Sequence, residues 1–380
     1  LSHFPKNNST GRGRMINVHQ IRFAAVVIAA MLVAAPSLAR GAGLVPLPPP
    51  KKQNAARVKL GRLLFFEGKL SGDGGVSCAS CHIPSKTWTD GKALSEGYPG
   101  TLYFRNMPTI LNTVYKNRLY RDGRMSGGDL PTLVRDHLTE AHFMLVDGRI
   151  FPERLKQVPE YVKLFKKAYG GEPSFGGTLK AVAAFVNTLN SRPSPLDRYL
   201  KGEKSALSNE AKKGLALFKG KAGCVKCHSG SLLSDGKFHA VGAPDNTKMF
   251  SDPLRHITYR RFLKTLGVGG YMNMREDVGL YAVTKNHKDR GKFRTPSLRE
   301  VGRTAPYMHG GSLKTLAAVV SFYNKGGGRH ANKSPRIKRL RLSKAEQRAL
   351  VSFLNSLSGA RVTMKDPKLP DYKIRKLGQN

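Results

Sequence analysis

The sequence predicts an all-α protein built from two tandem domains of the same design. The motif C-x-x-C-H occurs twice, at residues 78–82 and 224–228. Before and after each copy, apolar residues recur at the three- and four-residue spacing of an amphipathic helix. We expect the helix that follows each motif to pack across the helix that precedes it. The four helical segments are 55–65, 179–189, 208–218 and 343–357.

The pattern C-x-x-C-H is the signature of covalent haem attachment. Its thiols, one helical turn apart, add to the haem vinyl groups, and the adjacent histidine offers a ring nitrogen to the iron. A redox-active C-x-x-C pair does not need that histidine, and a zinc site needs further ligands at matching spacing. The chain has four cysteines, all within the two motifs. We predict two tandem cytochrome c-type domains, each enclosing one covalently bound haem c. The attachment residues are Cys78, Cys81, His82, Cys224, Cys227 and His228.

The first 43 residues have the composition of a leader and a secretory signal. Arg22 precedes the apolar run 23–35, and small residues follow it, as at a signal cleavage site. We therefore expect a periplasmic protein, or one in an equivalent exported compartment. An uncleaved anchor is the alternative, and only in that case do we expect membrane association.

Composition shifts divide the rest of the chain. Residues 44–54 are proline-rich and predict an extended linker. We assign 55–200 to an N-terminal haem domain and 201–360 to a C-terminal haem domain, because prolines 193 and 195 break the helical pattern between them. Residues 361–380 form a basic tail.

The chain is strongly basic, with a formal net charge of +40 from 65 lysines and arginines against 25 acidic residues. Nucleic acid is a common partner for such a charge, but an exported haem protein does not meet it, so we exclude it. Attraction to an acidic electron-donor protein or an acidic protein substrate is the better interpretation. Adaptation to an unusual medium is the alternative.

A series of motifs in a fixed order carries a family resemblance. The chain resembles the bacterial diheme cytochrome c peroxidases, including their MauG-type branch, over roughly residues 55–358. The matching blocks are Leu60-Gly61, Leu64-Phe65-Phe66, Ser77–His82, Arg105–Thr109, Tyr120–Arg124, Ser194–Tyr199, Cys224–His228, Gly291–Arg299 and Thr304–Gly311.

The resemblance implies different roles for the two haems. Haem 1, with His82 as proximal ligand, is expected to bind hydrogen peroxide. Haem 2, with His228, is expected to exchange electrons with an external partner. The family also places a calcium ion between its domains, and the matching ligands here are the Asn106 side chain and the Thr304 and Pro306 carbonyls, oxygen donors that suit a hard cation.

The second ligand of haem 2 separates the branches of the family. Peroxidases carry a methionine at the position that is Tyr323 here, and MauG-type proteins carry a tyrosine. A phenolate favours oxidised iron, whereas a thioether raises the potential. We predict Tyr323 as the ligand and keep a methionine as the alternative, with Met308 read as a packing residue.

The chain departs from the family near haem 1. Tyr98 stands where many peroxidases carry a removable distal histidine, so haem 1 is expected to be five-coordinate or bound by water or Tyr98. Phe143 stands where the family carries its acid–base glutamate. Either Glu140, His137 or His142 moves the proton instead, or the function is lost.

Two further departures concern electron transfer and docking. The family often has a tryptophan between its haems, and the matching residue here is Arg121. Residues 246–274 look like an insertion in the haem 2 domain, basic and aromatic, that suits an acidic partner or is simply solvated.

Together these features predict a periplasmic diheme peroxidase. It would either reduce hydrogen peroxide with electrons from a small redox protein or use peroxide to oxidise a protein substrate. The alternative is a non-catalytic diheme electron-transfer cytochrome or haem sensor, which Phe143 favours.

Overall fold

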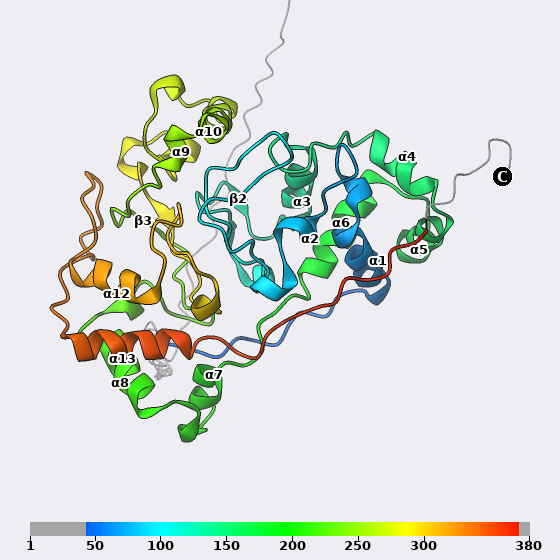
Figure 1. The fold of residues 1–380 in the computed structure, drawn as a ribbon. Helices are drawn as coiled ribbons and strands as arrows, with labels where there is room; N and C mark the ends of the chain where they lie inside the picture. Colours follow the sequence, from blue (N-terminus) through cyan, green and yellow to red (C-terminus); the bar gives the residue numbers. More distant parts are fainter. Residues whose placement is uncertain (1–42, 372–380) are drawn as a thin grey trace, which may run out of the picture. The chain divides into compact units, whose positions relative to one another are not determined.

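The computed structural model describes residues 43–371 and is mostly helical (Figure 1). The strands among these residues form two antiparallel pairs, each strand only two residues long. The pairs are β1 (Arg118–Leu119) with β2 (Met125–Ser126), and β3 (Phe238–His239) with β4 (Phe293–Arg294). The prediction of an all-α fold is confirmed in part: the described residues are mostly helical, with two short strand pairs.

The helices follow one another along the chain with long connections. In the first half they are α1 (Ala55–Phe66), α2 (Cys78–Cys81), α3 (Leu130–Thr139), α4 (Ile150–Lys156), α5 (Pro159–Tyr169) and α6 (Phe175–Val186). In the second half they are α7 (Pro195–Leu200), α8 (Asn209–Lys219), α9 (Lys248–Ser251), α10 (Pro253–Thr265), α11 (Tyr281–Thr284), α12 (Leu316–Asn324) and α13 (Lys344–Asn355). Short 3₁₀ helices are η1 (Gly68–Leu70), η2 (Pro84–Lys86), η3 (Thr113–Tyr115), η4 (Lys204–Ala206), η5 (Cys224–Lys226), η6 (Tyr271–Asn273), η7 (His287–Asp289) and η8 (Val301–Arg303). Within residues 43–371 no helix has the length and apolar character needed to cross a membrane.

Polar caps explain where the long helices begin. Ser208 caps α8, and Ser343 forms a reciprocal capping box with Glu346 at the start of α13, as the sequence predicts. The helix predicted over 179–189 begins earlier, at Phe175, because the Ser174 hydroxyl accepts the Gly177 amide. It also ends earlier, at Val186.

In each half the two long helices cross at a glycine. A β-carbon on Gly61 of α1 would lie 1.9 Å from the Ala181 carbonyl oxygen of α6. A β-carbon on Gly214 of α8 would lie 2.0 Å from the Ala349 carbonyl oxygen of α13. Only a residue without a side chain lets the helix backbones approach this closely.

Four residues beyond each crossing, two phenylalanines meet. The ring centroids of Phe65 and Phe185 are 5.3 Å apart, and those of Phe218 and Phe353 are 5.0 Å apart. Residues four apart lie on one face of a helix, so glycine and phenylalanine share the contact face in both halves. The repeated spacing indicates two copies of one structural unit.

The glycine crossing gives a first prediction. Gly214→Ala is expected to reduce the free energy of unfolding by about 1–3 kcal/mol, because the methyl group overpacks the crossing. Gly176→Ala in α6 is the matched control: a β-carbon at that position would meet no atom within 4 Å, and a helical alanine is expected to be neutral or stabilising by up to about 1 kcal/mol. Urea denaturation of both variants measures the difference, and equal effects would contradict the crossing argument.

Residues 43–371 belong to one compact unit that contains three hydrophobic clusters. The first is built on α1, α3, α5 and α6 around Phe65, Trp88 and Phe185. The second is built on α8, α12 and α13 around Phe218 and Phe353. It also takes in Leu44 and the α7 residue Leu196, so packing crosses the predicted edges of the domains, which remain predictions.

The third cluster joins the predicted insertion to the first half of the chain. Tyr259 and Phe262 of α10 pack against Phe104, with ring centroids 5.0 Å away in both cases. The Arg255 guanidinium donates to the Ser95 carbonyl at 2.7 Å and to the Tyr103 carbonyl. Although we predicted that this segment belongs to the haem 2 domain, these contacts hold α10 beside the loop that follows the first C-x-x-C-H motif.

The ends of the chain are only partly described. The predicted leader and signal fall almost entirely in residues 1–42, outside the described range. At the other end, Val362 and Met364 pack on the first cluster, and the Val362 carbonyl accepts the Trp88 indole N–H at 2.7 Å. The first part of the basic tail therefore runs back over the N-terminal half.

Candidate haem cavities and the wall between them

Two cavities each contain one C-x-x-C-H motif. The first has a volume of about 1360 Å³ and is lined by Cys78, Cys81 and His82 among largely apolar residues. The second has a volume of about 2150 Å³ and is lined by Cys224, Cys227 and His228. Both volumes include space open to solvent.

The two motif histidines are oriented in the same way. His82 Nδ1 lies 3.2 Å from the Trp88 carbonyl oxygen, and His228 Nδ1 lies 2.9 Å from the Leu233 carbonyl oxygen. A carbonyl only accepts, so each Nδ1 carries the proton and each Nε2 keeps its lone pair. Burial lowers the pKa of both imidazoles, which keeps them neutral. Metal-ligating histidines have this arrangement, so both sites fit a haem iron.

The cysteine environments disfavour a redox pair. Burial raises the pKa of Cys78 to about 12 and that of Cys224 to about 11. Redox-active C-x-x-C motifs depend on a lowered pKa that exposes a reactive thiolate. Protonated thiols in apolar cavities instead suit covalent attachment to a large apolar cofactor.

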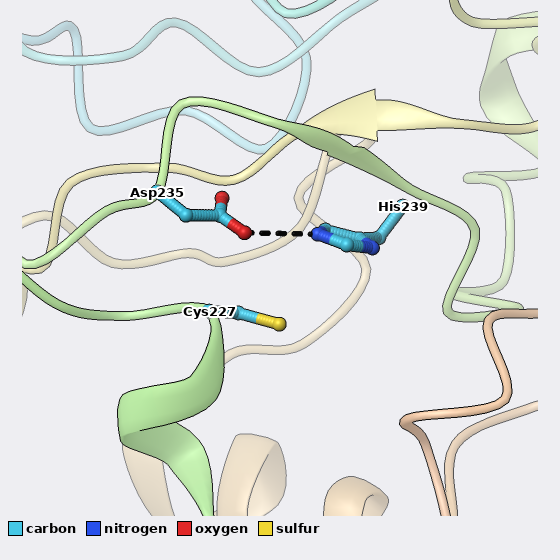
Figure 2. A group of neighbouring side chains, drawn as sticks. All are labelled: Cys227, Asp235 and His239. Atoms are coloured by element: carbon cyan, nitrogen blue, oxygen red, sulfur yellow. Dashed lines mark hydrogen bonds and ion pairs between the residues drawn. The ribbon is translucent and has the colours of Figure 1, made fainter. Parts of the chain in front are cut away.

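One group near the second motif has donor atoms close enough for a metal ion. One ligand atom each from Cys227, Asp235 and His239 lies within 4.8 Å of the others, and His239 Nε2 is 3.1 Å from an Asp235 carboxylate oxygen (Figure 2). A hydrogen bond with Cys227, and after it the contact with Asp235, raises the pKa of His239. Metal binding needs the Cys227 thiolate, which a thioether bond to haem removes. The group therefore competes poorly with haem attachment as an explanation of Cys227.

Of the three candidate proton carriers, His137 lines the first cavity. It lies in the last turn of α3, and its Nδ1 is 2.9 Å from the Leu133 carbonyl oxygen. Nδ1 therefore carries the proton, and Nε2 is left with a lone pair. Burial lowers the pKa of His137 to about 3, so the ring is neutral at physiological pH. Phe143 stacks on this ring at 4.3 Å between centroids.

The other two candidates lie away from the cavity lining. Glu140 is the C-cap of α3, and its side chain is 42% exposed. His142 is buried and stacks on Tyr103, with ring centroids 5.4 Å apart. Neither lines the first cavity. Tyr98, considered as a haem 1 ligand, does not line it either, because its hydroxyl accepts the Asp73 amide at 2.9 Å.

The second cavity contains both candidates for the second ligand of haem 2. Tyr323 lies on α12 and lines the cavity, as does Met308. Burial raises the pKa of Tyr323, and the neighbouring Cys224 and Cys227 raise it further. The phenol is therefore neutral unless a cation such as iron stabilises its charge.

One of the three residues expected to bind calcium, Asn106, has its side-chain oxygen engaged by another cation. Asn106 lines both cavities, whereas Thr304 and Pro306 line the second. The Asn106 side-chain oxygen accepts a hydrogen bond from Arg121 Nη2 at 2.5 Å, and its backbone carbonyl accepts from Arg121 Nε at 2.9 Å. The oxygen that the resemblance assigns to calcium is thus hydrogen-bonded to a guanidinium cation.

The sequence did not reveal a buried ion cluster around Arg105, which lines the first cavity. Arg105 is 2% exposed and pairs with Asp277 at 2.6 Å and with Asp122 at 2.5 Å. Arg124 also pairs with Asp122, at 2.8 Å. Arg105 and Asp122 lie in motif blocks that were recognised without a role, and no sequence signal links Asp277 to them.

Comparison with known proteins agrees with this construction. Two tandem helical units, each with a cavity lined by a C-x-x-C-H motif, are the features that define diheme c-type cytochromes. The family model for di-haem cytochrome c peroxidase matches residues 55–205. The cytochrome-c peroxidase IdrP2 of Pseudomonas sp. (strain SCT) is 49% identical over 93% of this chain and 95% of its own length. The chain belongs to the di-haem cytochrome c peroxidase family.

More distant relatives extend the same picture. The methylamine utilization protein MauG of Methylorubrum extorquens is 36% identical over 86% of this chain and 85% of its own length. Among solved structures, a MauG-like protein associated with microbial copper homeostasis superposes with a TM-score of 0.71 at 28% identity, covering 83% of this chain and 94% of that one. As a member of this family, the protein is an oxidoreductase with peroxidase function.

Proposed function

We propose that hydrogen peroxide reacts in the first cavity and that the second cavity exchanges electrons with a partner protein. His82 and His228 would hold the haem irons, which would supply the redox chemistry. The observation that carries this proposal is that the two cavities are lined by different functional side chains. The first contains His137, which can carry a proton, and the second contains Tyr323, which can coordinate a metal ion.

In the first cavity His137 acts as the proton carrier in place of the family glutamate. Its neutral ring can accept a proton at Nε2 from one peroxide oxygen and return it to the other as the O–O bond breaks. Phe143 and Tyr120 support this role by stacking on the ring, with centroids 4.3 Å and 5.7 Å away. This packing fixes the ring plane while the Leu133 carbonyl fixes the tautomer.

In the second cavity Tyr323 and His228 would be the residues that hold the haem iron. A phenolate stabilises oxidised iron, which suits a protein that stores oxidising equivalents for a protein substrate. Reduction of peroxide by a small electron-donor protein is the second candidate, because relatives at 49% and 43% identity carry the name cytochrome-c peroxidase.

Tyr323→Phe is expected to convert the low-spin haem signal of the oxidised protein to a high-spin signal. Removing the phenolic oxygen leaves that iron with one protein ligand. Tyr307→Phe is the matched control, since Tyr307 lines the same cavity but donates its hydroxyl to the Val301 carbonyl at 2.9 Å. Low-temperature electron spin resonance measures both variants. A low-spin signal that survives in Tyr323→Phe would remove Tyr323 from the site.

The partner is expected to be acidic. The chain carries a net charge of +40, and α10 presents Arg261 and Lys264 beside the exposed side chain of Ile257, which is 63% accessible. An apolar centre with a basic rim suits an acidic electron donor or substrate. We place the protein in the periplasm or an equivalent compartment, following the signal predicted over residues 1–43.

Mixing the oxidised protein with hydrogen peroxide tests the proposal. Rapid stopped-flow changes in the haem spectrum support a peroxidase, and an unreactive Soret band supports the non-catalytic carrier or sensor. A pyridine assay for covalent haem comes first, because fewer than two haems per chain would contradict the attachment of haem at both motifs.

A further inference from the structure

Three cations stand in the wall that the two cavities share. Residues that line both cavities are the segment 106–109 and the side chains of Lys116, Arg121 and Arg294. A group bound in either cavity would therefore meet the same positive charges. The three side chains come from the connection after η3, the turn between β1 and β2, and β4.

These cations lack acidic partners among residues 43–371. No ion pair there includes Lys116, Arg121 or Arg294, and their acceptors are neutral oxygens. Lys116 donates to the Thr109 carbonyl at 3.2 Å, and Arg294 donates to the Tyr120 carbonyl at 3.3 Å. The nearest carboxylate cluster is already neutralised, because Asp122 pairs with both Arg105 and Arg124.

The grouping of these three cations disfavours their charged forms, as the pKa of Lys116 shows. Burial, followed by repulsion from Arg294 and Arg121, lowers the pKa of Lys116 to about 7. All three side chains are partly buried and reach into the cavities. Mutually repelling cations without counter-charges destabilise a protein unless an anion joins them.

We propose that Lys116, Arg121 and Arg294 form one carboxylate-binding cluster that holds the propionate groups of both haems. The inference rests on the proposed attachment of a haem in each cavity. Propionates are the only charged groups at the rim of a haem, and a guanidinium binds carboxylates in a directed, bidentate way. Arg121 donates a hydrogen bond to the Asn106 side-chain oxygen that the resemblance assigns to calcium. The cluster would therefore supply the positive charge between the haems that a calcium ion supplies in the family.

The cluster predicts a shared effect on redox potential. Arg121→Gln removes a positive charge from the lining of both cavities, which would favour the oxidised state of an iron bound in either. For each haem, we expect the ratio of oxidised to reduced protein at a given potential to rise about tenfold. This corresponds to a midpoint potential lowered by about 59 mV. Spectroelectrochemical titration of the holoprotein measures both potentials. Arg118→Gln is the matched control, because Arg118 is exposed and lines neither cavity.

The outcomes separate this inference from the proposed function. If the wild-type chain carries fewer than two covalent haems, the proposed attachment itself fails. If both haems are present and Arg121→Gln shifts neither potential, or no more than Arg118→Gln does, the shared cluster is overturned. A shift in one potential only would also overturn it, because the cation would then serve a single haem.

Metal analysis tests the same inference by a second route. We expect no stoichiometric calcium in the purified holoprotein, and no change in either potential after treatment with EGTA and readdition of calcium. One calcium ion per chain, with potentials that move when EGTA removes it, would show that the wall binds a metal ion and would overturn the assignment of Arg121.

Discussion

Replacing His137 with glutamine is expected to slow the reaction with hydrogen peroxide by about 100- to 10,000-fold. The imidazole lines the first cavity, and its bond to the Leu133 carbonyl leaves the lone pair on Nε2. Glutamine keeps a polar side chain of similar reach but cannot carry a proton between the peroxide oxygens. The stopped-flow rate constant of the oxidised protein with peroxide measures the loss, which belongs to the chemical step if the haem content is unchanged.

Glu140→Gln and His142→Gln are the matched controls. Both change a titratable side chain within five residues of His137, but neither side chain lines the cavity. We expect each to keep the wild-type rate within a few-fold. A large loss in Glu140→Gln with an unaffected His137→Gln variant would transfer the role to Glu140.

The pH dependence distinguishes the same candidates. Burial lowers the pKa of His137 to about 3, so its proton-accepting form persists until the pH falls through that value. Burial instead raises the pKa of Glu140 above its ordinary value, so a glutamate base would lose activity at a higher pH. A rate that stays level as the pH falls below the ordinary glutamate pKa of about 4.3 supports His137, since an acid limb reports the pKa of the essential base.

The repeated unit could be predicted because its signals are local. Apolar spacing, the serine caps and the C-x-x-C-H motifs each depend on residues within a few turns of one another, and they fix α8 and α13 almost to the residue. The family resemblance added the order of the blocks. The start of α6 was missed because the Ser174 cap extends the helix by one turn.

The choice of proton carrier could not be made from the sequence. His137, Glu140 and His142 lie within six residues, and their directions depend on where α3 ends. The helix stops at Thr139, so His137 stays on the helix face while Glu140 becomes an exposed C-cap. A continuation by one turn would have placed Glu140 and His142 on the helix as well.

Contacts between charged residues far apart in the chain could not be predicted from the sequence either. The partners Arg105 and Asp277 are 172 residues apart, and Arg294 joins Lys116 and Arg121 only when the second half folds against the first. Pair distances of this kind follow from tertiary packing, which no spacing rule in one sequence reports. The position of α10 against Phe104 was missed for the same reason.

Asp277→Asn is expected to reduce the free energy of unfolding by about 3–5 kcal/mol, the usual cost of removing one partner from a buried ion pair. Asp277 accepts Arg105 Nε at 2.6 Å and Nη2 at 2.7 Å, and both side chains are at most 2% exposed. In the variant, Arg105 and Arg124 share the single carboxylate of Asp122, so the buried cluster carries one uncompensated positive charge. Glu203→Gln, which breaks the exposed pair with Arg198, is the control and is expected to cost less than about 1 kcal/mol.

A double-mutant cycle isolates the pair from its surroundings. Arg105→Met alone is also expected to destabilise, because it strands Asp277. Combined with Asp277→Asn, it should cost clearly less than the sum of the single changes, since neither charge is then left unpaired. Urea denaturation of the four proteins gives the coupling energy. Strict additivity would show that the two side chains act independently.

Acid should weaken this pair in a defined direction. Burial opposes ionisation of Asp277, but the charge and hydrogen bonds of Arg105 bring its pKa below the ordinary value. The unfolded chain therefore binds the proton more readily, so the stabilisation is complete above the unfolded pKa of about 4 and is lost as the pH falls through the folded pKa. The difference in unfolding free energy between wild type and Asp277→Asn should be largest at neutral pH and shrink in acid. Because Arg105 also lines the first cavity, the same acid range should loosen the wall that faces the peroxide site.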